Sequence, residues 1–170
     1  QGLETNLGYE TNGSLNSVSE KDLATGETRT TTIQNDAQGH VLAVNGPINP
    51  SSGPDDVVTF TYDTAGNLAS AQNGLGHNVT YPEYDAVGRP LAVYDANNVR
   101  NEFTYDALGR VTQVRMRDPA GEAGDAVSSF TYDGEGRVIS MTAPDTAPLT
   151  MHYDPAGRLD RISAPSGDYI

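Results

Sequence analysis

The chain contains no cysteine and no tryptophan among its 170 residues. Without cysteine it can form neither disulfide bridges nor thiolate metal sites. No apolar run approaches the ~20 residues that a membrane-spanning helix needs, and no segment has the periodicity of an amphipathic helix. Basic residues are scarce as well: 10 Lys and Arg stand against 23 Asp and Glu, and the net charge of −13 disfavours nucleic acid and anionic membranes as partners.

Glycine, proline and tyrosine are plentiful, with 18, 10 and 9 copies. This composition is typical of many short strands that are joined by tight turns. The chain begins with Gln1 rather than methionine, and a repeat is under way by residue 9. We therefore interpret the sequence as a piece of a longer polypeptide.

A seven-residue motif recurs along the whole chain: tyrosine, an acid, two variable residues, glycine, a polar residue and an apolar one. Its copies occupy residues 9–15, 35–41, 62–68, 84–90, 105–111, 132–138 and 153–159. The first two copies are degenerate, since Glu10 replaces aspartate and Asn35 replaces tyrosine. We predict a single array of about seven units over residues 1–170.

A residue that is present in every unit more often builds the unit than performs chemistry. We therefore predict structural roles for the tyrosines, acids, glycines and arginines of the five clear copies. These residues are Tyr62, Asp63, Gly66, Tyr84, Asp85, Gly88, Arg89, Tyr105, Asp106, Gly109, Arg110, Tyr132, Asp133, Gly136, Arg137, Tyr153, Asp154, Gly157 and Arg158.

Each unit has the pattern of a β-hairpin. Phe103 and Tyr105 alternate with a polar residue and so share one face of a strand. Asp106 can accept hydrogen bonds from the backbone of a turn, and Gly109 can adopt a positive φ, which together predict a type I turn with a glycine bulge. On the return strand, apolar residues recur three positions apart, and we expect a bulge to correct this phase. These pairs are Val41 and Val44, Val111 and Val114, Val138 and Met141, and Leu159 and Ile162.

Unit length varies outside the motif, in segments rich in glycine and proline. Residues 45–54 and 118–125 are the clearest of these segments, and we predict loop-like connectors there. A single hairpin cannot bury its apolar face alone, whereas stacked hairpins can. We therefore predict an all-β fold of antiparallel hairpins stacked into a curved, spiral sheet. Its open edges predict association with flanking repeats, other chains or copies of itself.

The motif Tyr-Asp-x-x-Gly-Arg-Leu/Val resembles the YD repeat, also called the RHS repeat. It matches fully at residues 105–111, 132–138 and 153–159, and with one change at 62–68 and 84–90, where Asn67 replaces arginine and Pro90 replaces the apolar residue. The family includes bacterial Rhs polymorphic toxins, wall-associated toxins, the C component of insecticidal Tc toxins, and teneurins.

The resemblance implies a segment of a hollow β-shell that encloses a toxin domain in a secreted or injected bacterial toxin. Its partners would be flanking repeats or other shell chains and an enclosed toxin domain. Its location would be outside the cell, on the cell surface or in a delivery system, after synthesis in the cytoplasm. An extracellular stalk or filament that binds carbohydrate or another cell is the alternative.

No catalytic residue, cofactor or metal site is predicted. A glycosidase needs two carboxylates at a set separation in one cleft, whereas these acids are spread over all units. We expect each repeated arginine to pair with an acid or to bond carbonyl groups of the neighbouring repeat. We expect each repeated tyrosine to be half-buried against the adjacent hairpin, with a platform for sugar rings as the alternative.

No metal site is expected at the three histidines or at the segment that begins with Asp95. His40, His77 and His152 are isolated and lack the spacing of a metal site. Residues 95–98 resemble the start of a calcium loop, but its glycine and distal glutamate are missing. We predict a surface turn at 95–98.

Overall fold

The computed structural model describes residues 2–47, 56–121 and 124–168. Much of the predicted connector at 45–54, and residues 122 and 123 of the one at 118–125, lie outside the described residues. The chain divides into two compact units, residues 1–81 and 82–170, and each is described by itself. The part of the chain covered by these ranges has no helix that could cross a membrane.

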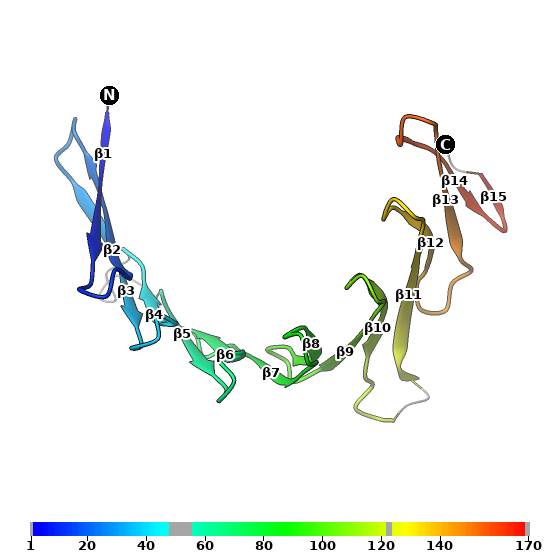
Figure 1. The fold of residues 1–170 in the computed structure, drawn as a ribbon, viewed down its shortest axis with the longest axis horizontal. Helices are drawn as coiled ribbons and strands as arrows, with labels where there is room; N and C mark the ends of the chain where they lie inside the picture. The colour runs from blue at the N-terminus through cyan, green and yellow to red at the C-terminus, as the bar shows by residue number, and fades with distance from the viewer. Residues whose placement is uncertain (1, 48–55, 122–123, 169–170) are drawn as a thin grey trace. The chain divides into compact units, whose positions relative to one another are not determined.

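The first unit is an antiparallel sheet in which each strand pairs with the next one along the chain (Figure 1). Its strands are β1 (Leu3–Tyr9), β2 (Leu15–Asp22), β3 (Thr28–Asn35), β4 (Val41–Asn45), β5 (Val57–Tyr62), β6 (Leu68–Asn73) and β7 (Asn78–Tyr84), the last of which runs on into the second unit.

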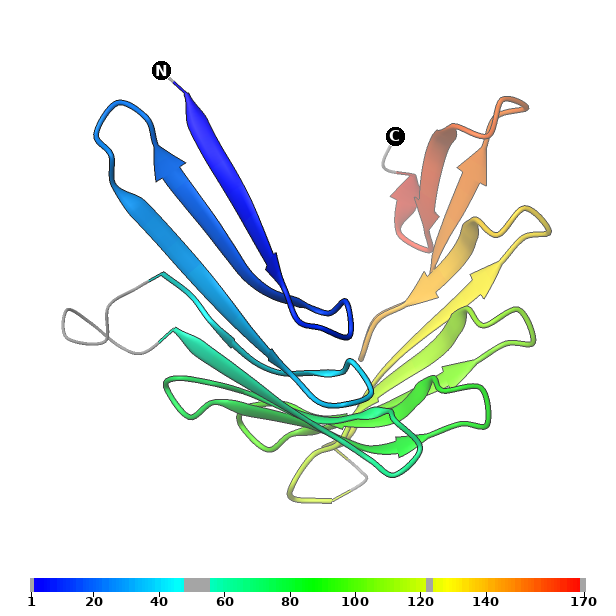
Figure 2. The ribbon, with the colours of Figure 1, turned by 60° about the vertical axis from the view of Figure 1, so that its left-hand side comes forward.

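The second unit repeats this arrangement (Figure 2). Its strands are β8 (Pro90–Tyr94), β9 (Arg100–Tyr105), β10 (Val111–Met116), β11 (Ala126–Tyr132), β12 (Val138–Thr142), β13 (Leu149–Tyr153), β14 (Leu159–Ala164) and β15 (Gly167–Asp168). The predicted all-β fold of stacked antiparallel hairpins is confirmed.

Six motif hairpins of the described residues have a β-bulge directly beside the turn. In the hairpin of β9 and β10, Tyr105 pairs with Val111, but Thr104 pairs with Gln113, so Thr112 is the extra residue of the bulge. Phe103 then pairs with Val114. A spacing of three residues on β10 thus faces a spacing of two on β9, which confirms the predicted correction of phase.

Because paired residues point to the same face of a sheet, the bulge gathers the apolar residues on one side. The register puts Phe130 and Tyr132 of β11 opposite Met141 and Val138 of β12 on that side. In the first unit, a hollow on the corresponding side is lined by five apolar residues of β4, β5 and β6. They are Val41, Val44, Phe60, Tyr62 and Leu68.

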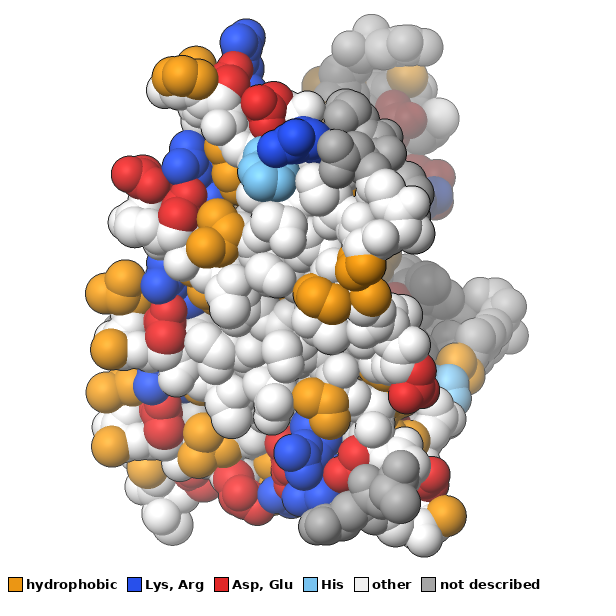
Figure 3. Space-filling model, turned by 90° about the vertical axis from the view of Figure 1, so that its right-hand side faces the viewer, with side chains coloured by type: hydrophobic (Ala, Val, Ile, Leu, Met, Phe, Trp, Pro, Cys, Tyr) orange, Lys and Arg blue, Asp and Glu red, His pale blue; other side chains and the backbone are white. Residues whose placement is uncertain are grey.

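Neither unit has a deeply buried core among the described residues. Ala92 is the one buried hydrophobic residue there, and no large side chain is fully buried. Most strand side chains are half-buried, because each unit is a single layer of strands. Uncharged polar side chains and backbone, in white, make up most of the surface seen in Figure 3. Contacts between neighbouring repeats must therefore supply much of the stability.

Candidate functional site: the links between repeats

The acid of the motif organises the turn. The Asp106 N–H donates to the Arg110 carbonyl oxygen at 2.9 Å, and the Asp106 carbonyl accepts from the Gly109 N–H at 3.0 Å. The Oδ1 atom of Asp106 accepts from the N–H groups of Leu108 and Arg110, both at 2.9 Å. Gly109 has a φ of 83°. This is the predicted type I turn with a glycine bulge.

The same contacts hold the carboxylates in their ionised form. The backbone N–H of Arg110 is the main cause that lowers the pKa of Asp106, and the Arg110 side chain adds to it. A carboxylate that accepts several hydrogen bonds is stabilised in its charged state. The pKa is lowered in the equivalent residues too, namely Asp36, Asp63, Asp85, Asp133 and Asp154.

One arginine touches two repeats. The Arg110 Nε donates to Asp106 Oδ2 at 2.6 Å within its own turn. Its Nη1 donates to the carbonyl oxygen of Asp133 in the next repeat at 3.1 Å. The guanidinium group also lies over the ring of Tyr132, 4.5 Å from the ring centre. We call this contact between a motif arginine and the next motif tyrosine an arginine link.

Two more arginine links occur in the second unit. Arg89 lies over Tyr105 at 4.6 Å, and Arg137 lies over Tyr153 at 4.7 Å. Both arginines also donate Nε to the aspartate of their own turn at 2.6 Å. The arrangement combines a charge-assisted hydrogen bond with a cation–π contact.

The tyrosine returns a bond to the preceding repeat. The Tyr132 hydroxyl donates to the Val111 carbonyl oxygen at 2.6 Å. We call this contact a tyrosine bond. Equivalent bonds run from Tyr62 to Val41, from Tyr105 to Pro90 and from Tyr153 to Val138, at 2.9, 2.7 and 2.8 Å. In the second unit, arginine links and tyrosine bonds thus join successive repeats in both directions.

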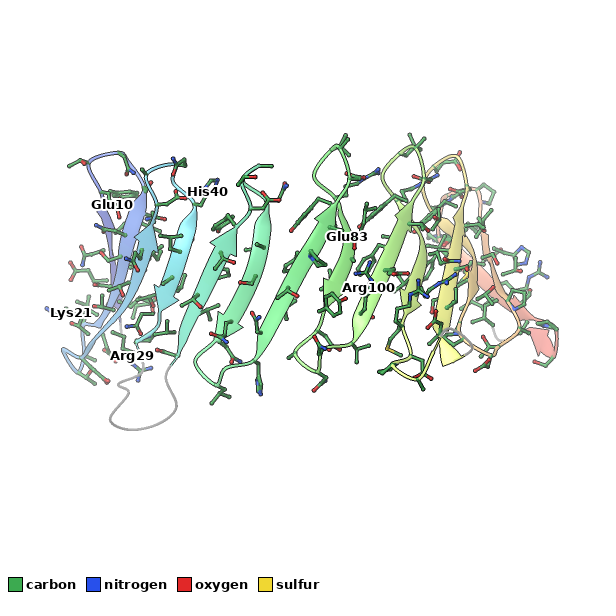
Figure 4. The ribbon with its side chains drawn as sticks, turned by 90° about the horizontal axis from the view of Figure 1, so that it is seen from below. Glu10, Lys21, Arg29, His40, Glu83 and Arg100 are labelled. Carbon is green, nitrogen blue, oxygen red and sulfur yellow. The ribbon has the colours of Figure 1, made fainter. Side chains whose placement is uncertain are left out.

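The degenerate repeats keep part of this pattern. Asn35, which replaces the tyrosine, donates its Nδ2 to the Leu15 carbonyl oxygen at 2.9 Å. His40, which replaces the arginine, lies at the motif-turn end of its hairpin (Figure 4). Its Nδ1 is 2.8 Å from Asp36 Oδ2, and its ring stacks on Tyr62 with 4.7 Å between centres. The replacement of the tyrosine by Asn35 was evident from the sequence, but the contacts that Asn35 and His40 make with neighbouring repeats were not predicted, although their positions in the motif could have revealed them.

The opposite ends of the hairpins use related turns. In residues 95–99, the Asp95 N–H donates to the Val99 carbonyl at 3.0 Å, and Asn98 takes the place of glycine with a φ of 62°. The predicted surface turn at 95–98 is confirmed. Residues 73–77 form a similar turn, in which the Asn73 N–H donates to the His77 carbonyl oxygen at 3.0 Å. Among the described residues, no three His, Asp or Glu side chains are grouped as metal ligands.

An ionic cluster in the second unit was not predicted. Arg100 donates to Glu83 at 2.8 Å and to Glu102 at 2.9 Å, and the first pair can be seen in Figure 4. Arg117 pairs with Glu102 at 3.0 Å and with Asp125 at 2.9 Å. The side-chain hydrogen bond from Arg100 is the main cause that lowers the pKa of Glu102. Arg100 and Glu102 are two residues apart and therefore share one face of a strand, and this spacing could have indicated an ion pair.

Comparison with known proteins agrees with the motif. Residues 84–123 and 132–169 match the family model of the RHS repeat. No curated protein matches the chain at a significant level.

Solved structures share the fold. A crystal structure of TcdB2-TccC3 is similar with a TM-score of 0.70 and 19% identity over 92% of this chain, which spans 9% of that chain. The TcdB2-TccC3-TEV structure has a TM-score of 0.61 and 17% identity over 96% of this chain and 10% of that one.

Proposed function

We propose that this chain is a wall segment of a hollow β-shell that encloses a toxin domain in a secreted or injected RHS-type toxin. The observation that carries the proposal is the two-way joining of repeats by arginine links and tyrosine bonds, as at Arg110 and Tyr132. Similarity in fold to TcdB2-TccC3 over 92% of the chain supports it.

The repeated polar groups have structural roles within the turns. The Asp106 carboxylate accepts two backbone N–H groups and the Arg110 side chain, so its lone pairs are engaged within the turn. Backbone groups between neighbouring strands satisfy one another across the sheet. A wall of this kind resists local opening, and it can hold an enclosed chain away from proteases and from the producing cell.

Catalysis by the motif acids is the less favoured role. An acid–base pair needs one carboxylate whose pKa is raised beside one whose pKa is low. In Asp85, Asp106, Asp133 and Asp154 the pKa is lowered in every case.

An adhesive stalk that binds carbohydrate is the second candidate. Such binding requires an aromatic face that is free to stack on a sugar ring. The rings of Tyr105, Tyr132 and Tyr153 each carry a guanidinium group within 4.7 Å of the ring centre. Their hydroxyls donate to the preceding repeat. These contacts favour the wall over the stalk.

The test uses this segment together with its natural flanking sequence. Electron microscopy is expected to show a hollow particle with density inside it. Limited proteolysis is expected to spare the enclosed region while the shell is intact. A solid filament without a cavity would overturn the proposal, and specific binding on a glycan array would favour the adhesive stalk.

A further inference from the structure

The residue after the motif glycine differs between the two units. In residues 82–170 it is always arginine, at positions 89, 110, 137 and 158. In residues 1–81 it is Ser14, His40 or Asn67. The one arginine of residues 1–81, Arg29, lies outside the motif, has a side chain that is 67% exposed, and pairs with Glu27 at 3.6 Å. The arginine link is therefore confined to the second unit.

The residues that replace the motif arginine in the first unit make fewer or weaker contacts with the next repeat than the arginines do. Asn67 donates its Nδ2 to Asp63 Oδ2 of its own turn at 2.9 Å. His40 contacts Asp36 and Tyr62, but its ring replaces a group that carries a permanent charge. The backbone N–H of Ser14 donates to Asn12 Oδ1 at 2.9 Å, again within one turn.

The first unit nevertheless keeps the returning bond at each junction. Asn35 bonds the Leu15 carbonyl, and Tyr62 bonds the Val41 carbonyl, both at 2.9 Å. The second unit has that bond and a permanent cation over the tyrosine ring. It also carries the ionic cluster around Arg100 and Glu102, where two guanidinium groups bridge three carboxylates.

We infer that the array opens in a fixed order, with the repeats of residues 1–81 separating before those of residues 82–170. In a linear repeat array, stability is a sum of unit and junction contributions, so the array opens first where its junctions are weakest. Such an order would allow the repeats at one end of a β-wall to separate while the repeats at the other end stay paired. It depends only on the junctions and not on what the wall encloses.

Hydrogen exchange measured by mass spectrometry tests this order on the 170-residue chain. β5 and β11 hold equivalent places in their repeats, since each ends in the motif tyrosine. The difference of one cation–π contact predicts about two- to fivefold lower protection for β5 than for β11. Equal protection, or lower protection for β11, would overturn the inference.

Two variants test the cause. His40→Arg installs the missing cation between Asp36 and Tyr62, and it is expected to raise the protection of β4 and β5 about two- to fivefold. Arg110→Ser is expected to lower the protection of β10 and β11 by a similar factor. Arg29→Ser removes an arginine outside the motif and is the matched control, with no change expected.

The His40→Arg variant tests whether the arginine links set the order of opening. If His40→Arg leaves the protection of β4 and β5 unchanged, arginine links do not set the order and the inference fails. These measurements need no cargo, so they test the inference separately from the proposed function. A hollow particle without ordered opening would contradict only the inference. Ordered opening without a cavity would contradict only the proposed function.

Discussion

Arg110 shows how one side chain can serve two repeats. Its Nε holds the carboxylate of Asp106, and its guanidinium plane covers the ring of Tyr132. Lysine could supply the charge but not the planar fork that reaches both partners. The tyrosine in turn presents its ring to the arginine and its hydroxyl to the Val111 carbonyl. Motif residues are thus connected across the repeat boundary as well as along the chain.

Removing the Tyr132 hydroxyl tests the tyrosine bond. Tyr132→Phe leaves the Val111 carbonyl without this donor, and we expect a loss of about 1 kcal/mol in the free energy of unfolding. Urea denaturation measures the change. Tyr9→Phe is the control, because Tyr9 of the first motif is 59% exposed. Equal losses in the two variants would show that the tyrosine bond contributes nothing specific.

Two glycines in successive motif turns differ both in backbone conformation and in the space around them. Gly109 has a φ of 83°, and an added Cβ would lie 3.3 Å from the Arg89 Nη1 atom. Gly134 lies in the next motif turn, and an added Cβ would meet nothing within 4 Å. We expect Gly109→Ala to cost about 1–2 kcal/mol of unfolding free energy because of its left-handed backbone. Thermal and urea unfolding should show a clearly smaller effect for Gly134→Ala.

Each hairpin is built from a local turn and a corrected strand. The turn brings Asp106 and Gly109 together, and the bulge at Thr112 returns Val111 and Val114 to the face of Tyr105 and Phe103. Without the bulge, one of the two valines would point to the polar face. A motif of seven residues therefore sets both the reversal of the chain and the pattern of the next strand.

The acids of the turns predict how stability depends on pH. Their pKa values are below the ordinary 3.8 in the folded chain, first through backbone N–H donors in Asp85 and Asp106. This contribution is therefore fully present above about pH 4–5, and it is lost as the pH falls through the lowered folded values. Urea midpoints measured from pH 6 down to pH 2 should fall steeply below pH 4.

Asp106→Asn provides the matching variant. Asn73 already accepts the N–H groups of Leu75 and His77 in an equivalent turn, so asparagine is expected to preserve the turn at position 106. The variant should lose stability at pH 7 and show a shallower decline in acid, because one titrating carboxylate is gone. An unchanged acid profile would contradict the assigned role of the carboxylate.

Each unit is one layer of strands with little buried interior, and β1 stands at an edge of the first unit. Exposed edges pair with other chains, and Leu3 and Leu7 of β1 are 62% and 54% exposed. We expect the 170-residue chain to associate with itself or with flanking repeats through such edges. Light scattering should show species larger than a monomer, and a strict monomer would contradict this expectation.

A charge on β1 should reduce this association. Leu7→Lys places an amine on the edge strand, where lysine opposes pairing with another strand. Leu75→Lys is the control, because Leu75 is 62% exposed but lies in a turn. The association constant from light scattering or sedimentation should fall for Leu7→Lys only. Equal effects would point to net charge rather than to the strand edge.

The hairpins could be predicted from sequence because their causes lie within a few residues. Aspartate and glycine three residues apart define the turn, and the spacing of Val111 and Val114 required a bulge. The family resemblance followed from the same local motif. The contacts that Asn35 and His40 make in place of the motif tyrosine and arginine were not predicted from the sequence. They depend on which repeat lies alongside.

The order of turns and strands was settled by the amino-acid sequence, since local hydrogen bonds and side-chain alternation act over short distances. Which partner each side chain meets across the sheet was settled by strand register. Register brings Arg110 over Tyr132, 22 positions away, and Arg100 beside Glu83, 17 positions away. Both contacts join residues of different hairpins, so they form only once those hairpins have stacked.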